Sequence, residues 1–227
     1  MFGLILFLYS FTSNRNNSRK LVKTDIIFND SQDVFIEAET VNKLLIENKS
    51  DVKGIRKEQL DLNRLEKALN NHNMIEKSEV FVTVDGVLKA VIKQKTPIVR
   101  VITESGSFYI DYEGNRMPLS EIQSARIPLV SGNEEWIEKE EFNELFRYIY
   151  DDEFLKKNII GIQILPNGGV KLANRNYDYV IDFGKPQSID RKFANYKAFF
   201  QKASSDSTLL KYKKVNLKFT QQVVCTK

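Results

Sequence analysis

Few side chains in this 227-residue sequence have the types and spacing that catalysis requires. The single histidine, His72, closes the polar stretch NNHN behind an expected helix, where a surface position is more plausible than a general base. Cys225 has no histidine near it in the sequence to activate it as a nucleophile. The acidic run Asp151-Asp152-Glu153 could supply paired carboxylates, but such runs are common on protein surfaces. We therefore expect no catalytic residue.

Metal and cofactor sites are not indicated either. One histidine and one cysteine cannot supply a His-rich or thiolate zinc site. The stretch PNGG at 166–169 lacks the Lys-Ser/Thr pair that a phosphate-binding loop requires. We expect no metal, no cofactor and no small-molecule substrate, which favours a binding or scaffolding protein over an enzyme.

The composition is that of a globular protein, with 42% hydrophobic and 28% charged residues. The net charge is +4, and basic and acidic residues are interspersed. This pattern predicts a solvated surface and no nucleic-acid partner. With one cysteine there is no internal disulfide, and we interpret Cys225 as a buried structural thiol.

The N-terminus is apolar and then turns abruptly polar and basic. MFGLILFLYSF has eleven residues, fewer than the roughly 20 that span a bilayer as a helix. It lacks the basic start and the cleavage site of a signal peptide. A buried segment and an interfacial segment remain alternatives, but we favour a truncated membrane anchor over 1–12 with a polar linker over 13–20. The expected anchoring residues are Phe2, Leu4, Ile5, Leu6, Phe7 and Leu8.

The next segment, 21–98, has the pattern of a small domain with the order β-α-α-β-β. A strand is expected within 20–30 and helices within 39–49 and 59–73, the second capped by Asp61. Two alternating runs within 78–94 flank Asp85-Gly86, which predicts a hairpin with a two-residue type I′ turn.

The remainder, 99–227, is richer in strands. Apolar residues at helical spacing predict one amphipathic helix over 140–150 and another over 188–203. Strands with turn signals occupy most of the rest, and a pair of strands is expected on either side of Asn167-Gly168-Gly169. We therefore predict an α+β protein whose second domain is mostly antiparallel β with flanking helices.

The chain ends on an alternating run from Tyr212 to Lys227, which predicts one long half-buried strand. Val215, Leu217 and Phe219 are expected to anchor it to the core. A strand at the end of a chain can present a free edge to a partner.

Four stretches in this order resemble the bacterial cell-division family FtsQ, called DivIB in some bacteria, and most of all its versions in Bacteroidota. The first is LDLNRLEKALNNHNMIEKSEVFVTVDGVLKAVIKQKTPIVRV, which is similar to the second half of the family's POTRA domain. FYIDYEGNRMPLS, ARIPLVSG and VNLKF resemble three segments of the β domain that follows it.

This resemblance implies a single-pass protein of the cell inner membrane with most of its chain in the periplasm. It implies a non-enzymatic divisome scaffold for septum formation that binds FtsB/FtsL-like division proteins. In such a complex the partner adds a strand to the C-terminal edge. The residues expected to bind it are Phe219, Thr220, Gln221, Gln222, Val223 and Val224.

Two other interpretations remain open from the sequence. POTRA domains also occur in periplasmic proteins of outer-membrane assembly or secretion, although those usually carry several such domains or a membrane barrel. An exported enzyme is the third interpretation, and a catalytic turnover abolished by Cys225→Ala would support it.

Overall fold

The computed structural model describes residues 2–17, 20–29, 33–46, 53 and 55–227. The chain forms two compact units. The first comprises residues 1–95 together with 120–124, and the second comprises 96–119 and 125–227. The first unit therefore ends three residues before the predicted boundary at residue 98, and the membership of 120–124 in it was not predicted.

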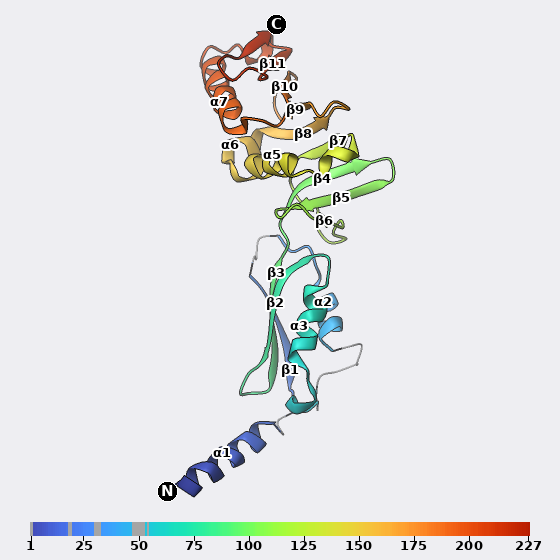
Figure 1. Cartoon of the computed structure of the whole chain (residues 1–227), viewed down its shortest axis with the longest axis vertical. Helices are drawn as coiled ribbons and strands as arrows, with labels where there is room; N and C mark the ends of the chain where they lie inside the picture. Colours follow the sequence, from blue (N-terminus) through green and yellow to red (C-terminus); the bar gives the residue numbers. More distant parts are fainter. Residues whose placement is uncertain (1, 18–19, 30–32, 47–52, 54) are drawn as a thin grey trace. The chain divides into compact units, whose positions relative to one another are not determined.

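The first unit has the predicted order β-α-α-β-β. Its elements are α1 (Phe2–Asn17), β1 (Lys23–Phe28), α2 (Ala38–Leu45), the 3-10 helix η1 (Lys57–Gln59), α3 (Leu62–Asn70), β2 (Ile75–Val82) and β3 (Val87–Gln94). The sheet order is β1-β3-β2, with β1 parallel and β2 antiparallel to β3. Figure 1 shows α2 and α3 beside this sheet.

The helices of this unit form because their apolar residues recur once per turn. Leu65 and Leu69 of α3 are buried, as are Val41 and Leu45 of α2. The predicted cap is confirmed, since the Asp61 carboxylate accepts a hydrogen bond of 3.0 Å from the backbone N–H of Arg64. Such a cap satisfies a backbone donor that the first turn leaves unpaired.

The hairpin between β2 and β3 is present, but the predicted type I′ turn is wrong. Gly86 has a φ of +80°, whereas Asp85 is not among the positive-φ residues, so only one turn position is left-handed. The N–H of Gly86 donates to the carbonyl of Thr83, and the N–H of Thr83 donates to the carbonyl of Val87. The loop is therefore one residue longer, with glycine in the left-handed position of a bulge.

Helix α1 carries the apolar N-terminus and continues to Asn17, so residues 13–17, which were expected in a polar linker, are helical. The large apolar side chains between Phe2 and Phe11 are each more than half exposed. Within the described residues no helix is both long and apolar enough to cross a membrane, and α1 has 16 residues.

The second unit is built on one nine-stranded sheet. Its strands are β4 (Pro97–Thr103), β5 (Gly106–Asp111), β6 (Arg116–Met117), β7 (Leu129–Gly132), β8 (Ile159–Ile164), β9 (Val170–Asn174), β10 (Val180–Gly184), β11 (Lys214–Asn216) and β12 (Val224–Thr226). Its helices are α4 (Glu134–Ile137), α5 (Glu140–Asp151), α6 (Glu153–Asn158), α7 (Ile189–Ser205) and the 3-10 helix η2 (Leu209–Lys211). The strand order is β12-β11-β10-β9-β8-β7-β4-β5-β6.

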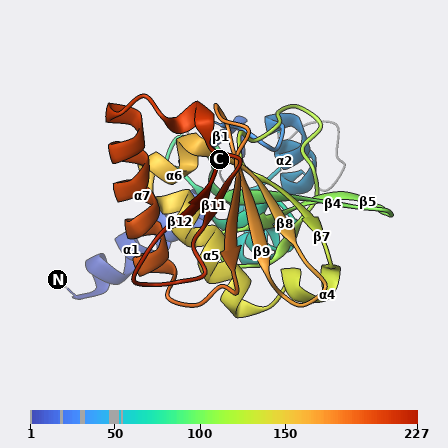
Figure 2. The same cartoon turned by 90° about the horizontal axis from the view of Figure 1, so that it is seen from above.

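Most strand pairs in this sheet are antiparallel, as predicted, and three pairs are parallel: β4 with β7, β7 with β8, and β10 with β11. The connections of the last two pairs contain helices, whereas β5 and β6 of the same sheet lie between β4 and β7 in sequence. Figures 1 and 2 show α5, α6 and α7 gathered on one side of the sheet. Their buried faces include Phe146 and Phe193, which belong to the same core as the strands.

The predicted single terminal strand is wrong. Only residues 214–216 and 224–226 are strands, and β12 folds back antiparallel on β11. The chain turns after Asn216, whose side-chain oxygen accepts a hydrogen bond of 3.0 Å from the N–H of Lys218. An Asn side chain that binds its own backbone two residues on is a turn former. Val215 and Leu217 are buried as expected, but Phe219 is 52% exposed and does not anchor the core.

Candidate partner-binding edge

Strand β12 forms one edge of the nine-stranded sheet. It pairs with β11 in the register Lys214 to Thr226, Val215 to Cys225 and Asn216 to Val224. On its other side no strand of the described residues pairs with it. A strand edge presents backbone N–H and C=O groups that another strand can pair with. The structure therefore provides the backbone geometry that strand addition requires.

A buried carboxylate ties β11 and the following loop to β10. Asp182 of β10 is 4% exposed, and its Oδ2 lies 2.8 Å from Nζ of Lys214 and 3.0 Å from Nζ of Lys218. Burial alone would raise the pKa of Asp182, but the hydrogen bonds from the two lysines outweigh it and lower the pKa. The carboxylate therefore stays ionised and holds both lysines at the base of the edge.

The loop 217–223 is held in place by further hydrogen bonds. The N–H of Leu217 donates to the carbonyl of Asp182 at 2.9 Å. From α7, the Asn195 side-chain amide donates to the carbonyl of Thr220 at 2.9 Å. The loop thus runs from the sheet to α7 before the chain returns as β12.

A pocket of about 350 Å³ lies between α7 and this loop. Apolar groups of Phe199, Tyr212 and Val223 contribute to its walls. Polar groups that line it include Gln222 and Lys202. Val223 lines the pocket and is followed directly by Val224, the first residue of β12, so the pocket lies next to the start of the free edge.

The six residues predicted to bind the partner fall in different environments. Phe219 to Val223 lie in the loop, and Val224 begins β12. Gln221, Gln222 and Val223 line the pocket, while Phe219 and Val224 are 52% and 43% exposed. The structure therefore places only Val224 on the edge, and adds Cys225 and Thr226, which the prediction did not include.

A signal for the turn was present in the sequence. Asn216 is a turn-forming residue within the run, because an Asn side chain can accept a hydrogen bond from the backbone two residues later, here at Lys218. The pair Gln221-Gln222 also puts a polar residue where the apolar alternation required an apolar one. Both features interrupt the pattern from which the long strand was predicted.

The side chains first considered for catalysis or phosphate binding have contacts or environments in the fold that do not indicate those roles. His72 Nδ1 accepts a hydrogen bond of 3.3 Å from the N–H of Met74, and burial lowers the pKa of His72. Burial raises the pKa of the Cys225 thiol, which disfavours the nucleophilic thiolate. The Asn167 side chain of PNGG accepts a hydrogen bond of 3.0 Å from the N–H of Gly169 within the β8–β9 turn.

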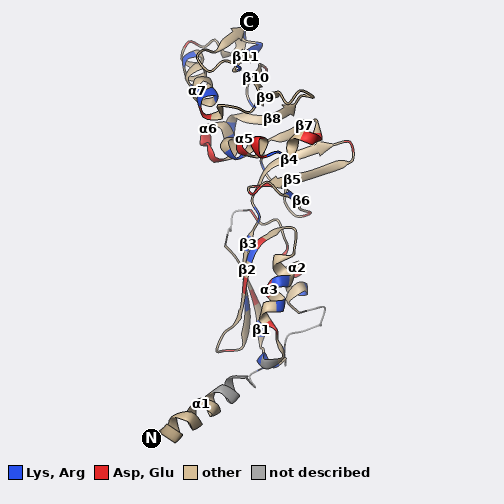
Figure 3. Ribbon diagram, viewed as in Figure 1, with Lys and Arg blue, Asp and Glu red and all other residues tan. Residues whose placement is uncertain are grey.

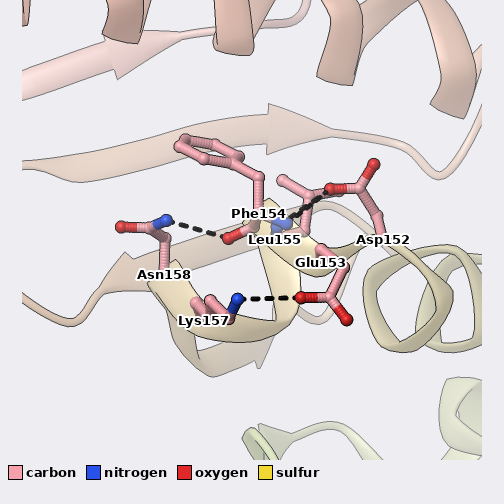
Figure 4. Close-up of polar contacts among 6 residues, drawn as sticks. All are labelled: Asp152, Glu153, Phe154, Leu155, Lys157 and Asn158. Carbon is pink, nitrogen blue, oxygen red and sulfur yellow. Dashed lines mark hydrogen bonds and ion pairs between the residues drawn. The ribbon is translucent and has the colours of Figure 1, made fainter.

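The acidic run at 151–153 is used in helix capping and surface pairing (Figure 4). Asp152 Oδ1 accepts hydrogen bonds from the N–H groups of Phe154 and Leu155 at 3.1 and 3.0 Å, which caps α6. Glu153 pairs with Lys157 one turn later at 2.8 Å. Asp152 also pairs with Lys197 of α7, so its carboxylate links two helices.

In the part of the chain that the structure describes, no group of three or more His, Cys, Asp or Glu side chains gathers to hold a metal ion. Among the described residues, the features that remain for function are surfaces. The outer edge of β12 is unpaired, as are those of β1, β2 and β6, and an unpaired strand edge suits binding by strand addition.

Comparison with known proteins supports both units. A family model described as FtsQ/DivIB, C-terminal related, matches residues 96–226, and a model described as POTRA-like domain matches residues 22–93. No curated protein matches the chain.

Proposed function

Because the chain belongs to the FtsQ/DivIB family, whose C-terminal model matches more than half of it, we propose that it is a scaffold of the bacterial divisome. Family membership indicates a role in cell division. The POTRA-like first unit is the second component of this assignment. The scaffold acts by binding other division proteins and carries out no catalytic step.

The partner adds a strand to the free edge of β12, and FtsB/FtsL-like proteins are the proposed partners. The observation that carries this proposal is the unpaired outer edge of β12, within the described residues, at the end of the sheet. Main-chain hydrogen bonds along the edge supply affinity, and alternate side chains supply specificity. Val224 and Thr226 point to the same side of the strand, and the Cys225 side chain points to the other, toward the core.

The N-terminal segment anchors the scaffold in the inner membrane, with both units in the periplasm. The support is the exposure of the large apolar side chains of α1, which the described residues leave open to water. The expected anchoring residues, from Phe2 to Leu8, are each at least 51% exposed.

The strand-addition proposal is tested with a matched pair of proline variants. Val224→Pro removes a backbone donor from β12 and fixes φ, so we expect binding to an FtsB/FtsL-like partner to fall at least about tenfold. Gln221→Pro lies in the loop and outside the strand ladder, so we expect it to retain most of the binding. Affinity is measured with purified proteins, and circular dichroism verifies that both variants are folded.

A long terminal strand would make the two prolines equally damaging, because both would interrupt one ladder. Full binding by the folded Val224→Pro protein would overturn strand addition at β12.

The cellular role is tested by depletion. Filamentous cells with incomplete septa are expected if the protein is a divisome scaffold. Defects in outer-membrane proteins with normal septa would instead favour the alternative of outer-membrane assembly.

A further inference from the structure

We propose that the tip of the β2–β3 hairpin, with the chain that follows α1, forms a surface that rests on an anionic lipid bilayer. The proposal rests on the proposed anchoring by α1, and it adds a second membrane contact made by the folded first unit. Residues 20–23, 55–58 and 83–87 form this surface, which we call the hairpin-tip surface.

Backbone contacts bring the three segments to one end of the unit. The N–H of Val22 donates to the carbonyl of Gly86 at 2.8 Å, and the N–H of Leu21 donates to the carbonyl of Ile55 at 2.8 Å. A Cβ on Gly86 would lie 2.7 Å from the carbonyl oxygen of Lys20, so glycine permits this close approach. Figure 1 shows the hairpin tip and the start of β1 at the same end of the sheet.

The hairpin-tip surface exposes two aliphatic side chains. Val84 at the tip is 71% exposed and Val22 is 53% exposed. Isolated exposed valines are ordinary on a soluble surface. These two are brought to the same end by the contact between Val22 and Gly86, and Val22 follows the end of α1 by a few residues.

The charge of this end favours an anionic surface. The residues of this surface, 20–23, 55–58 and 83–87, include four basic and two acidic ones, Glu58 and Asp85, and so carry a net charge of +2. Basic residues next to a membrane segment are attracted to anionic headgroups, and the attraction falls off within a Debye length. Blue segments in Figure 3 mark basic residues at this end of the first unit.

Chain length keeps the surface close to the membrane. Four residues lie between Asn17, the last residue of α1, and Val22, so five Cα–Cα steps join them. A chain of this length spans at most about 18 Å, and the headgroup layer is itself about 5–7 Å thick on each side. An anchored α1 therefore limits how far Val22, and the hairpin tip bonded to it, can lie from the lipid headgroups.

The test places an environment-sensitive fluorophore on the hairpin tip of the full chain. Val84→Cys is made in a Cys225→Ser background and labelled, since Cys225 is the only native cysteine. Ser105→Cys is the matched control, because Ser105 lies in the β4–β5 connection, between Thr103 and Gly106, in the second unit. Each protein is bound to vesicles of phosphatidylcholine mixed with phosphatidylglycerol, and flotation is measured first.

We expect position 84 to be quenched by lipids that carry a quencher near the headgroup and to be shielded from aqueous iodide. Position 105 should show the reverse. In vesicles of phosphatidylcholine alone, the lipid quenching at position 84 should fall, because the electrostatic attraction is lost.

The outcomes separate this inference from the anchoring proposal. Flotation with iodide quenching at position 84 equal to that at 105 would leave the anchor standing and overturn the hairpin contact. Equal lipid quenching with and without phosphatidylglycerol would overturn the role of charge. Failure of the full chain to float would overturn both proposals.

Discussion

At the scale of single residues, Asp182 shows how one carboxylate organises the end of the sheet. It is almost fully buried, yet it is paired with two lysines that are each about half exposed at 46% and 51%. A buried charge is tolerated when it is paired and hydrogen-bonded, and leaving one unpaired is costly. Both lysines belong to the chain that leads into the candidate edge, so this pair stabilises the position of β11.

Asp182→Asn is therefore expected to lower the free energy of unfolding of the second unit by about 1–3 kcal/mol near neutral pH. Because the folded-state pKa is lowered, the contribution is complete above the ordinary value of 3.8 and is lost as the pH falls through the folded pKa. The difference between the two proteins should consequently shrink below about pH 4. Urea unfolding followed by the fluorescence of Trp136, the single tryptophan, measures it.

Glu153→Gln is the control for this prediction. The side chains of Glu153 and Lys157 are 85% and 74% exposed, so the change should leave the urea midpoint nearly unchanged. An equal loss in both variants would contradict the special role of Asp182.

At the scale of elements, strand pairing in the second unit depends on close backbone approach. Gly132 ends β7 with a φ of +113°, and a Cβ there would lie 1.9 Å from the carbonyl oxygen of Ile164 at the end of β8. Only glycine can occupy this position without moving the two strands apart. The parallel pair β7–β8, which the sequence did not predict, therefore requires this residue.

Gly132→Ala is expected to destabilise the second unit by about 2–4 kcal/mol, through backbone strain and overlap with β8. Gly106→Ala is the matched control, because its φ is +146° but no atom lies within 4 Å of the new Cβ. We expect the control to cost about 1 kcal/mol. The urea midpoints of the two variants are compared. Similar midpoints would show that the overlap between the new Cβ at position 132 and the carbonyl of Ile164 is relieved at little cost in stability.

At the scale of the whole molecule, the first unit is discontinuous in sequence. Residues 120–124 belong to it although they lie between strands of the second unit. The hydroxyl of Ser120 donates to the carbonyl of Phe35 at 2.7 Å, and the N–H groups of Ile122 and Gln123 donate to the same hydroxyl at 3.3 Å. One side chain thus organises the returning segment.

Ser120→Ala is expected to destabilise the first unit by about 1–2 kcal/mol and to leave the second unit unchanged. Faster hydrogen exchange around Ile36 and in the 120–124 segment would show the first effect. An unchanged Trp136 unfolding transition would show the second. A shift of that transition alone would mean that the segment serves the other unit.

Removal of residues 2–12 tests the anchor. We expect the shortened protein to leave the membrane fraction. Both units should keep their circular dichroism and unfolding transitions, because the apolar side chains of α1 are exposed and do not belong to a hydrophobic core. Fractionation of cells that express the two forms measures this. Continued membrane association of the shortened form would assign membrane binding to another part of the chain.

Features that depend on local periodicity can be predicted from the sequence without the structure. Helical spacing fixed α3 and α5, the alternation on either side of Asp85-Gly86 located the β2–β3 hairpin, and four motifs indicated the family. These signals act over a few residues, or over the order of short segments, so they can be read without knowing which strands are neighbours.

Which strands are neighbours depends on long-range packing and is seen in the folded structure alone. The parallel pairs, the return of 120–124 and the antiparallel fold of β12 on β11 all join segments that are separated in sequence or by a turn. The long terminal strand was predicted because alternation reports which side chains face a core and does not report where the backbone reverses. Asn216 reverses it, so the edge available to a partner is the short β12, Val224–Thr226, and the preceding loop instead lines a pocket against α7.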